Sequence, residues 1–273
     1  MHSGNLILVN ARYAYQGQAT EDLVALADEG VSGKRREAAG TAHAAAASAE
    51  ESACLGTRQV PILLKRRAAV LLDELLKKTG ARDAIALVSG WRSFQEQQGI
   101  WDDSIAESGL EFTRKYVAVP GHSEHETGLA IDLGQNQGQI DFICPRFPYD
   151  GICGIFRKFA ASHGFIERYP AGKERVTGIG HEPWHFRYVG VPHALIMDEE
   201  GLTLEEYVDF LRQYPVGRPF YYRRNGLIVS VSWLEAAEDK MAVSLPEQYP
   251  CSLSGNNVDG FIMTEWRGAD GSK

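Results

Sequence analysis

The chain has 273 residues, of which 44% are apolar, 23% charged and 10% aromatic, and its net charge is −8. This length suits one large domain, or one domain with a small appendage, and the composition is that of a globular protein. The negative charge argues against a general nucleic-acid binder and against a surface for anionic lipid. The sequence contains no apolar run long enough to span a membrane and no secretory h-region, so we expect a cytoplasmic protein, or a cell-envelope protein if a leader or anchor has been removed.

The first 57 residues are predicted to be an N-terminal extension of the main domain. The apolar run LILV at residues 6–9 predicts a short strand. Residues 30–50 are polar and then rich in alanine, which favours a helix but leaves little to bury. We therefore expect a loop and an exposed helix in that part of the extension.

Residues 58–214 are predicted to form the main domain. Leucine and valine recur at helical spacing over 58–79, and Gly80 follows at the expected C-terminal cap. A short strand over 84–88 is then followed by a helix over 93–108, with Ser93 as its N-cap. Arg92 therefore lies at a strand-to-helix corner, an exposed kind of position that often serves function.

The stretch PGHSEHETGLAIDLG, Pro120 to Gly134, has the densest set of potential metal ligands. It contains two histidines, two glutamates and one aspartate. Its second half alternates apolar and other residues over 129–133, which predicts a strand. Asp132 shares a strand face with the small Ala130, so there is space beside its carboxylate.

The remainder of the chain is predicted to alternate between short helices and strands. Up to residue 214 these are helices over 154–163, 192–197 and 204–214, a strand from 165 and a strand over 184–189. The dipeptide Asn225-Gly226 between two β-rich runs predicts a hairpin, and further strands are expected over 241–245 and 261–266. We therefore interpret residues 215–273 as a small β-rich appendage without a catalytic motif.

A second cluster, HEPWHFRY, begins at His181 and has two possible interpretations. Its first five residues fit H-E-x-x-H, in which a helix places both histidines on one face. Pro183 opposes a helix because it lacks a backbone donor and clashes with the preceding turn. In the other interpretation Pro183 ends a loop and Trp184 begins a strand, so that His185 faces a site that Glu182 also approaches.

A catalytic zinc ion usually has three protein ligands and one open position. His185 supplies one ligand, and His125 and Asp132 can supply the other two. A zinc ion there would lower the pKa of a water molecule, and Glu182 would take its proton as general base. Arg92 would offer a fixed cation to the substrate carbonyl or to the developing oxyanion.

Two other groups of residues leave alternatives open. His122 is a rival ligand because it is spaced i, i+3 with His125. The four cysteines are far apart and contain no CxxC pair, so we expect reduced thiols. A Cys144–Cys153 bridge is the alternative.

Three segments resemble motifs of the VanY, VanX and VanXY family of zinc D,D-peptidases (peptidase family M15). SEHETGLAID at 123–132 resembles S-x-H-x-x-G-x-A-x-D, and EPWHFRYVG at 182–190 resembles E-x-x-H. SGWRSFQEQ at 89–97 resembles S-G-Y-R-S-x-x-x-Q, with tryptophan in place of tyrosine. The motifs occur in the family's order. In its expected cellular location, the chain most resembles the VanXY-like members.

The resemblance implies an α+β fold with a small central antiparallel sheet flanked by helices, here with a C-terminal β-rich appendage. It implies that Zn²⁺ is bound by His125, Asp132 and His185. It also implies that Glu182 is the catalytic base and that Arg92 polarises the carbonyl.

The same resemblance places Ser123 near the C-terminal carboxylate of the substrate and Gln97 in the lining of the site. Trp184, beside a ligand, is expected to line the substrate site as well. The implied substrates are peptidoglycan precursors or dipeptides that end in D-Ala-D-Ala, as in vancomycin resistance. One alternative is an L,D-carboxypeptidase acting on tetrapeptides, and another is a zinc-containing module that binds peptidoglycan without cutting it.

Overall fold

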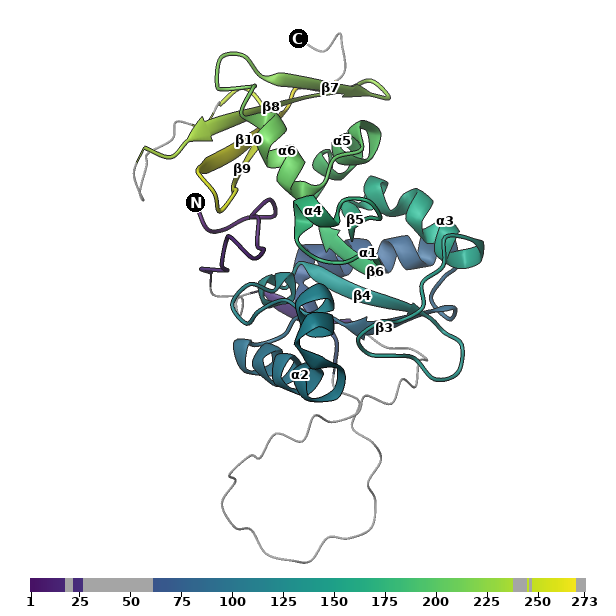
Figure 1. The fold of residues 1–273 in the computed structure, drawn as a ribbon. Coiled ribbons are helices and arrows are strands. Elements are labelled where there is room, and N and C mark those ends of the chain that lie inside the picture. The colour runs from purple at the N-terminus through teal and green to yellow at the C-terminus, as the bar shows by residue number, and fades with distance from the viewer. Residues whose placement is uncertain (18–21, 27–60, 238–244, 246, 269–273) are drawn as a thin grey trace, which may run out of the picture.

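The computed structural model describes residues 1–17, 22–26, 61–237, 245 and 247–268 of the chain (Figure 1). The helix predicted within 30–50 lies outside these residues, as does the strand predicted over 241–245 except for its last residue. Three cysteines, Cys144, Cys153 and Cys251, are free, so the alternative Cys144–Cys153 bridge is wrong.

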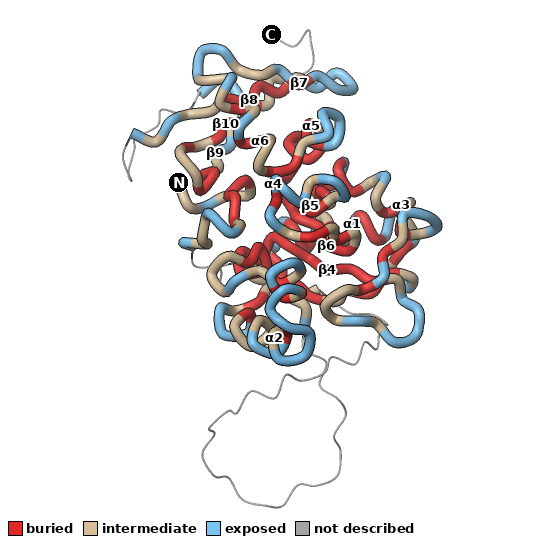
Figure 2. Tube along the Cα trace, in the orientation of Figure 1, coloured by how far each residue is buried: buried red, intermediate tan, exposed pale blue. Residues whose placement is uncertain are grey.

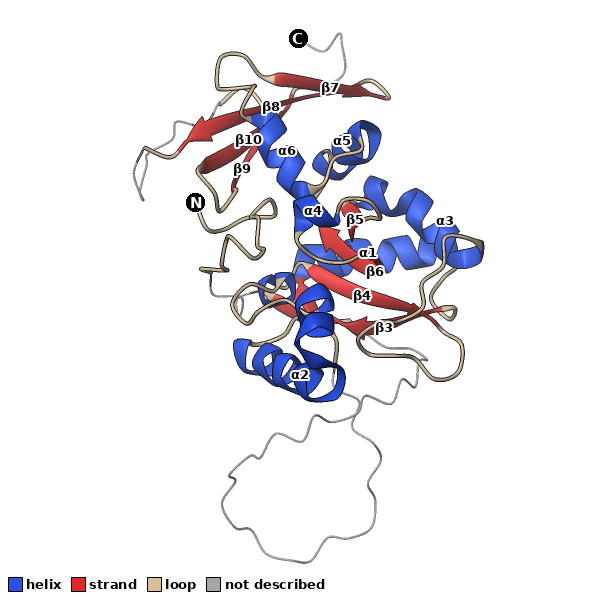
Figure 3. Cartoon of the chain, viewed as in Figure 1, coloured by secondary structure: helices blue, strands red, loops and turns tan. Residues whose placement is uncertain are grey.

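A four-stranded antiparallel sheet forms the centre of the main domain. Its strands are β3 (Ile85–Ser89), β4 (Ala130–Gln135), β5 (Phe165–Tyr169) and β6 (Glu182–Tyr188), in the order β3-β4-β6-β5. Figure 3 shows helices packed around this sheet. The predicted α+β class with a central antiparallel sheet is therefore confirmed.

One face of the sheet packs on helices α1 (Arg66–Thr79) and α3 (Gly151–Ala160). The contact buries leucines of α1, Phe156 of α3, and alternate residues of β4 and β6, including Phe186. Figure 2 shows β4 and β6 buried along most of their length. This core fixes the orientation of both strands, so their other residues point toward the opposite face of the sheet.

The first two predicted helices differ most in their bounds from those in the structure. The first begins at Arg66 because Leu63–Lys65 form strand β2, which pairs with β1 (Leu23–Ala25). The second, α2 (Phe94–Tyr116), runs on beyond residue 108 through a break at Gly109, whose φ is 82°. Ser93 caps α2 as predicted.

Short helices connect the longer elements. They are the 3₁₀ helices η1 (Glu124–Thr127) and η2 (Ala161–His163) and the one-turn helix α4 (Glu174–Thr177). Gly128 ends η1 with a φ of 70°, and a Cβ there would lie 2.8 Å from Leu23. A glycine is therefore needed where the motif passes from η1 into β4.

The C-terminal part of the structure is a second four-stranded sheet and two helices. These are α5 (His193–Glu200), α6 (Leu204–Leu211), β7 (Phe220–Arg224), β8 (Leu227–Glu235), β9 (Cys251–Gly255) and β10 (Gly260–Trp266). The strand order is β7-β8-β10-β9. Asn225 and Gly226, with φ values of 49° and 78°, form the predicted hairpin turn between β7 and β8.

The apolar run at residues 6–9 is buried but is not a strand. Leu6 and Leu8 join the core of the second sheet with residues of α5, α6, β8 and β10. Backbone hydrogen bonds, among them Leu8 N to Asn256 O at 3.0 Å, connect the N-terminal segment to the C-terminal sheet. The N-terminal segment thus packs against the C-terminal sheet, beside β9 (Figure 1).

Within the described ranges, no helix is both long enough and apolar enough to cross a membrane.

Candidate active site

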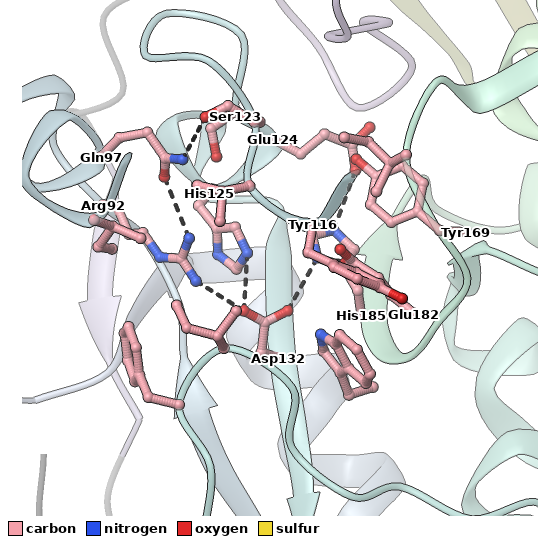
Figure 4. A pocket seen from close by; sticks show the side chains of 17 residues that line it. Arg92, Gln97, Tyr116, Ser123, Glu124, His125, Asp132, Tyr169, Glu182 and His185 are labelled. Atoms are coloured by element: carbon pink, nitrogen blue, oxygen red, sulfur yellow. Dashed lines mark hydrogen bonds and ion pairs between the residues drawn. The ribbon is translucent and has the colours of Figure 1, made fainter. Parts of the chain in front are cut away.

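The pairing of β4 with β6 places Asp132 directly opposite His185. Both side chains leave the sheet on the face opposite the α1 and α3 core and are buried. Asp132 Oδ1 lies 3.0 Å from His185 Nδ1. The strand register alone therefore brings together two of the three predicted ligands (Figure 4).

His125 comes from η1, immediately before β4. Its Nδ1 lies 2.7 Å from the carbonyl oxygen of Gly90, and a carbonyl only accepts, so Nδ1 carries the proton. The lone pair of Nε2 then faces Asp132 Oδ2, 3.1 Å away. Ligand atoms of His125, Asp132 and His185 lie within 4.8 Å of one another, as expected for a shared metal ion.

The donor atoms fit a cation in three further respects. Asp132 Oδ1 has no hydrogen-bond partner among the described residues, although it is buried. Burial lowers the pKa of His125 to about 4, so this ring is neutral and can act as a ligand. Burial alone would also lower the pKa of His185, but Asp132 and Glu124 raise it to about 9, which shows that the site favours positive charge at this ring.

Glu182 is the first residue of β6, and its Oε2 lies 3.7 Å from His185 Nδ1. Burial raises the pKa of Glu182 to about 8. A carboxylate with a raised pKa in a pocket is suited to accept and return a proton.

The helical interpretation of HEPWH is wrong, because all residues from Glu182 to Tyr188 are in strand β6. Pro183 lies within the strand rather than in a loop before it. His181 lies outside the ligand group, where its Nε2 is 2.8 Å from the hydroxyl of Tyr149. His122 is also outside the group formed by His125, Asp132 and His185, and its Nδ1 lies 2.7 Å from the carbonyl oxygen of Asn10.

Arg92 connects strand β3, helix α2 and strand β4 through hydrogen bonds. Its guanidinium donates to Ser89 Oγ at 2.8 Å, to Gln97 Oε1 at 3.2 Å and to Asp132 Oδ2 at 2.8 Å. Contrary to the sequence-based expectation of an exposed corner, Arg92 is only 8% exposed. Gln97 in turn donates to the carbonyl oxygen of Ala118 at 2.8 Å, so Arg92 is held in place.

All eight predicted site residues line one pocket, including Ser123 and Trp184. Trp184 also belongs to the core beneath the sheet. The pocket wall contains further residues that sequence reasoning missed, among them Tyr116, Phe142, Tyr169 and Ile179. Tyr169 is the β-sheet partner of Glu182, and only the pairing of β5 with β6, which the sequence does not reveal, brings it to the site.

Comparisons with known proteins agree with this geometry. The sequence model of a family described as VanY, D-alanyl-D-alanine carboxypeptidase, matches residues 61–191. The bifunctional D-Ala-D-Ala dipeptidase and carboxypeptidase VanXYC of Enterococcus gallinarum is 44% identical over 153 residues, which are 56% of this chain and 80% of that protein.

Two solved structures are also similar. The vancomycin resistance D,D-dipeptidase VanXYg, in complex with a D-Ala-D-Ala phosphinate analogue, matches with a TM-score of 0.84 at 42% identity, covering 97% of this chain and 95% of that one. A vancomycin resistance D,D-pentapeptidase VanY in complex with Zn(II) matches with a TM-score of 0.54 at 27% identity, covering 75% and 98%.

Proposed function

This chain belongs to the VanY family of D-alanyl-D-alanine carboxypeptidases, and we propose that it is a zinc metallopeptidase that hydrolyses D-Ala-D-Ala termini. Its substrates would be peptidoglycan precursors, the free dipeptide, or both. The observation that supports this most strongly is the convergence of three ligand residues, a buried carboxylate and a fixed arginine in one pocket.

His125, Asp132 and His185 would bind the zinc ion. Two imidazoles and one carboxylate suit Zn²⁺, and three protein ligands leave a position open for catalysis. The Zn(II) in the related VanY structure supports the choice of metal. When bound, zinc would supply Lewis acidity that activates a water molecule and polarises the scissile carbonyl.

Glu182 and Arg92 would carry out the remaining steps. Glu182 accepts a proton from the attacking water and transfers it to the amine of the departing D-alanine. Arg92, fixed by Ser89 and Gln97, directs its positive charge at the carbonyl oxygen as negative charge develops there. Its contact with Asp132 Oδ2 at 2.8 Å places this cation beside the metal ligands.

The substrate would be oriented by the rest of the pocket. Ser123 is proposed to bind near the C-terminal carboxylate of the substrate, Gln97 to line the pocket, and Trp184 to form an apolar wall. All of these residues fall within the proposed catalytic domain, 58–214, with 1–57 as an extension and 215–273 as an appendage. The proposed cytoplasmic location can be tested by cell fractionation with an antibody against the chain.

A substrate panel tests the proposed activity. Purified protein would be incubated with D-Ala-D-Ala, UDP-MurNAc-pentapeptide and a tetrapeptide, and the released D-alanine measured. Release from either of the first two supports the proposal. Turnover of the tetrapeptide alone would favour an L,D-carboxypeptidase, and no turnover in protein with a full complement of zinc would favour a binding module.

Replacing Arg92 with alanine is expected to lower kcat by about 10²–10³-fold, because a preorganised charge at the oxyanion is lost. Lysine at this position retains the charge but not the three-pronged hydrogen bonding, so it should restore part of the rate. Steady-state D-alanine release with zinc content measured in parallel checks this. Unchanged kcat in the zinc-loaded alanine variant would rule out the assigned role.

A further inference from the structure

A buried carboxylate that has no part in the mechanism above lies directly behind the metal site. The side chain of Glu124 is 0% exposed, as are those of Arg168 and Arg187. Glu124 Oε1 accepts a hydrogen bond from Arg168 Nε and another from Arg187 Nη1, each at 2.8 Å. Glu124 thus forms ion pairs with two buried arginines.

The second oxygen of this carboxylate faces a metal ligand. Glu124 Oε2 lies 3.5 Å from His185 Nε2. Neither atom has a hydrogen-bond partner among the described residues, and both are buried. The other ring nitrogen, Nδ1, lies 3.0 Å from Asp132 Oδ1, so the His185 ring stands between two carboxylates (Figure 4).

We propose that Glu124 is a positioning residue for the metal ligand His185. Its carboxylate accepts the Nε2–H of the imidazole, which fixes the tautomer in which the Nδ1 lone pair faces the metal. A carboxylate behind a ligating histidine orients the ring and makes it a more basic ligand. This inference rests on the zinc site proposed above.

The surroundings explain why Glu124 can hold a fixed position. Arg168 also donates two hydrogen bonds to Glu205 of α6, at 2.9 and 2.7 Å. Arg187 also donates to the carbonyl oxygens of Asn5 and Ile7, at 3.1 and 3.0 Å. The carboxylate is thus anchored to α6 and to the N-terminal segment, and Oε2 is left to face His185.

The variant Glu124→Gln tests the role with little change in shape. The two arginines accept no hydrogen bonds, so they hold the amide oxygen and direct the amide NH₂ toward His185 Nε2. That group donates, which favours the opposite tautomer and removes the lone pair from Nδ1. The matched control is Glu205→Gln, which also removes a negative charge beside Arg168 but makes no contact with His185.

Zinc affinity, measured by competition with a chromogenic chelator, is the decisive readout. We expect Glu124→Gln to bind zinc about 10–100-fold more weakly than wild type, and Glu205→Gln to bind close to wild type. Long-range ¹H–¹⁵N spectra of zinc-loaded wild type should show the His185 ring protonated at Nε2. Equal affinity losses in both variants, wild-type affinity in Glu124→Gln, or a proton at Nδ1 would overturn the proposal.

Glu124→Gln leaves the buried charges of Arg168 and Arg187 without their carboxylate partner, which destabilises the fold. If Glu124→Gln does not fold, Glu124→Asp tests the positioning role in its place. Aspartate keeps the charge but is shorter by one methylene, so its carboxylate lies farther from His185 Nε2. It should also bind zinc more weakly than Glu205→Gln, and equal binding would overturn the role. A wild-type chain that binds no zinc would instead refute the proposed function itself, and the positioning role with it.

Discussion

Replacing Glu182 with glutamine is expected to lower kcat for D-alanine release by about 10²–10⁴-fold. The amide has the shape of the carboxylate but does not accept a proton from the attacking water. Zinc content should remain at the wild-type level, because Glu182 is outside the group His125, Asp132 and His185. Initial rates on D-Ala-D-Ala, with metal analysis of the same samples, measure both quantities.

The matched control is Glu174→Gln, which makes the same charge change at an exposed carboxylate of α4 that does not line the pocket. Its activity should equal that of the wild type. If the Glu182→Gln variant hydrolysed substrate at the wild-type rate, the assignment of the general base would be wrong.

Replacing His185 with alanine is expected to abolish stoichiometric zinc binding and, with it, activity. Loss of a residue that only hydrogen-bonds to a ligand weakens metal binding by about 10–100-fold. Loss of the ligand itself should weaken zinc binding by more than this. The same substitution at His181 should leave zinc binding intact, since that ring faces Tyr149 and not the ligand group. Zinc per chain after dialysis, measured by atomic emission, distinguishes the two variants.

These two histidines are the outer positions of HEPWH, so the pair also tests how the motif is used. Metal loss in His181→Ala with retention in His185→Ala would contradict the strand geometry of β6. It would require a helix in which both rings share one face, as in H-E-x-x-H proteins.

Much of the site could be predicted from the sequence because local rules determine it. Pro183 and the aromatic residues after it oppose a helix, and the strand β6 confirms this. The alternation around Asp132 predicts which side chains leave the sheet on the face away from the core. Ser93 and the Asn225-Gly226 turn likewise depend on short-range chemistry, and both predictions are confirmed.

The parts that were missed depend on contacts between distant segments. Arg92 is buried rather than exposed because Gln97 and Asp132, from α2 and β4, surround it. The buried state of Glu124 arises from Arg168 and Arg187, which lie 44 and 63 residues away in sequence. No periodicity in a single sequence encodes such pairings.

The predictions for the helix from residue 58 and for the strand over 6–9 are wrong for a related reason. The helix predicted from residue 58 starts later because Leu63–Lys65 pair with Leu23–Ala25, and strand pairing overrides a helical pattern of leucines. The run at residues 6–9 is apolar because Leu6 and Leu8 fill a core shared with the C-terminal sheet, not because it is a strand.

D-alanine release from D-Ala-D-Ala and UDP-MurNAc-pentapeptide, before and after removal of metal, tests the central claim most directly. Protein stripped with a chelator should release no D-alanine, and one equivalent of zinc should restore the rate on at least one of the two substrates. D-alanine release at the full rate from metal-free protein would contradict the account, as would zinc-loaded protein that cuts neither substrate.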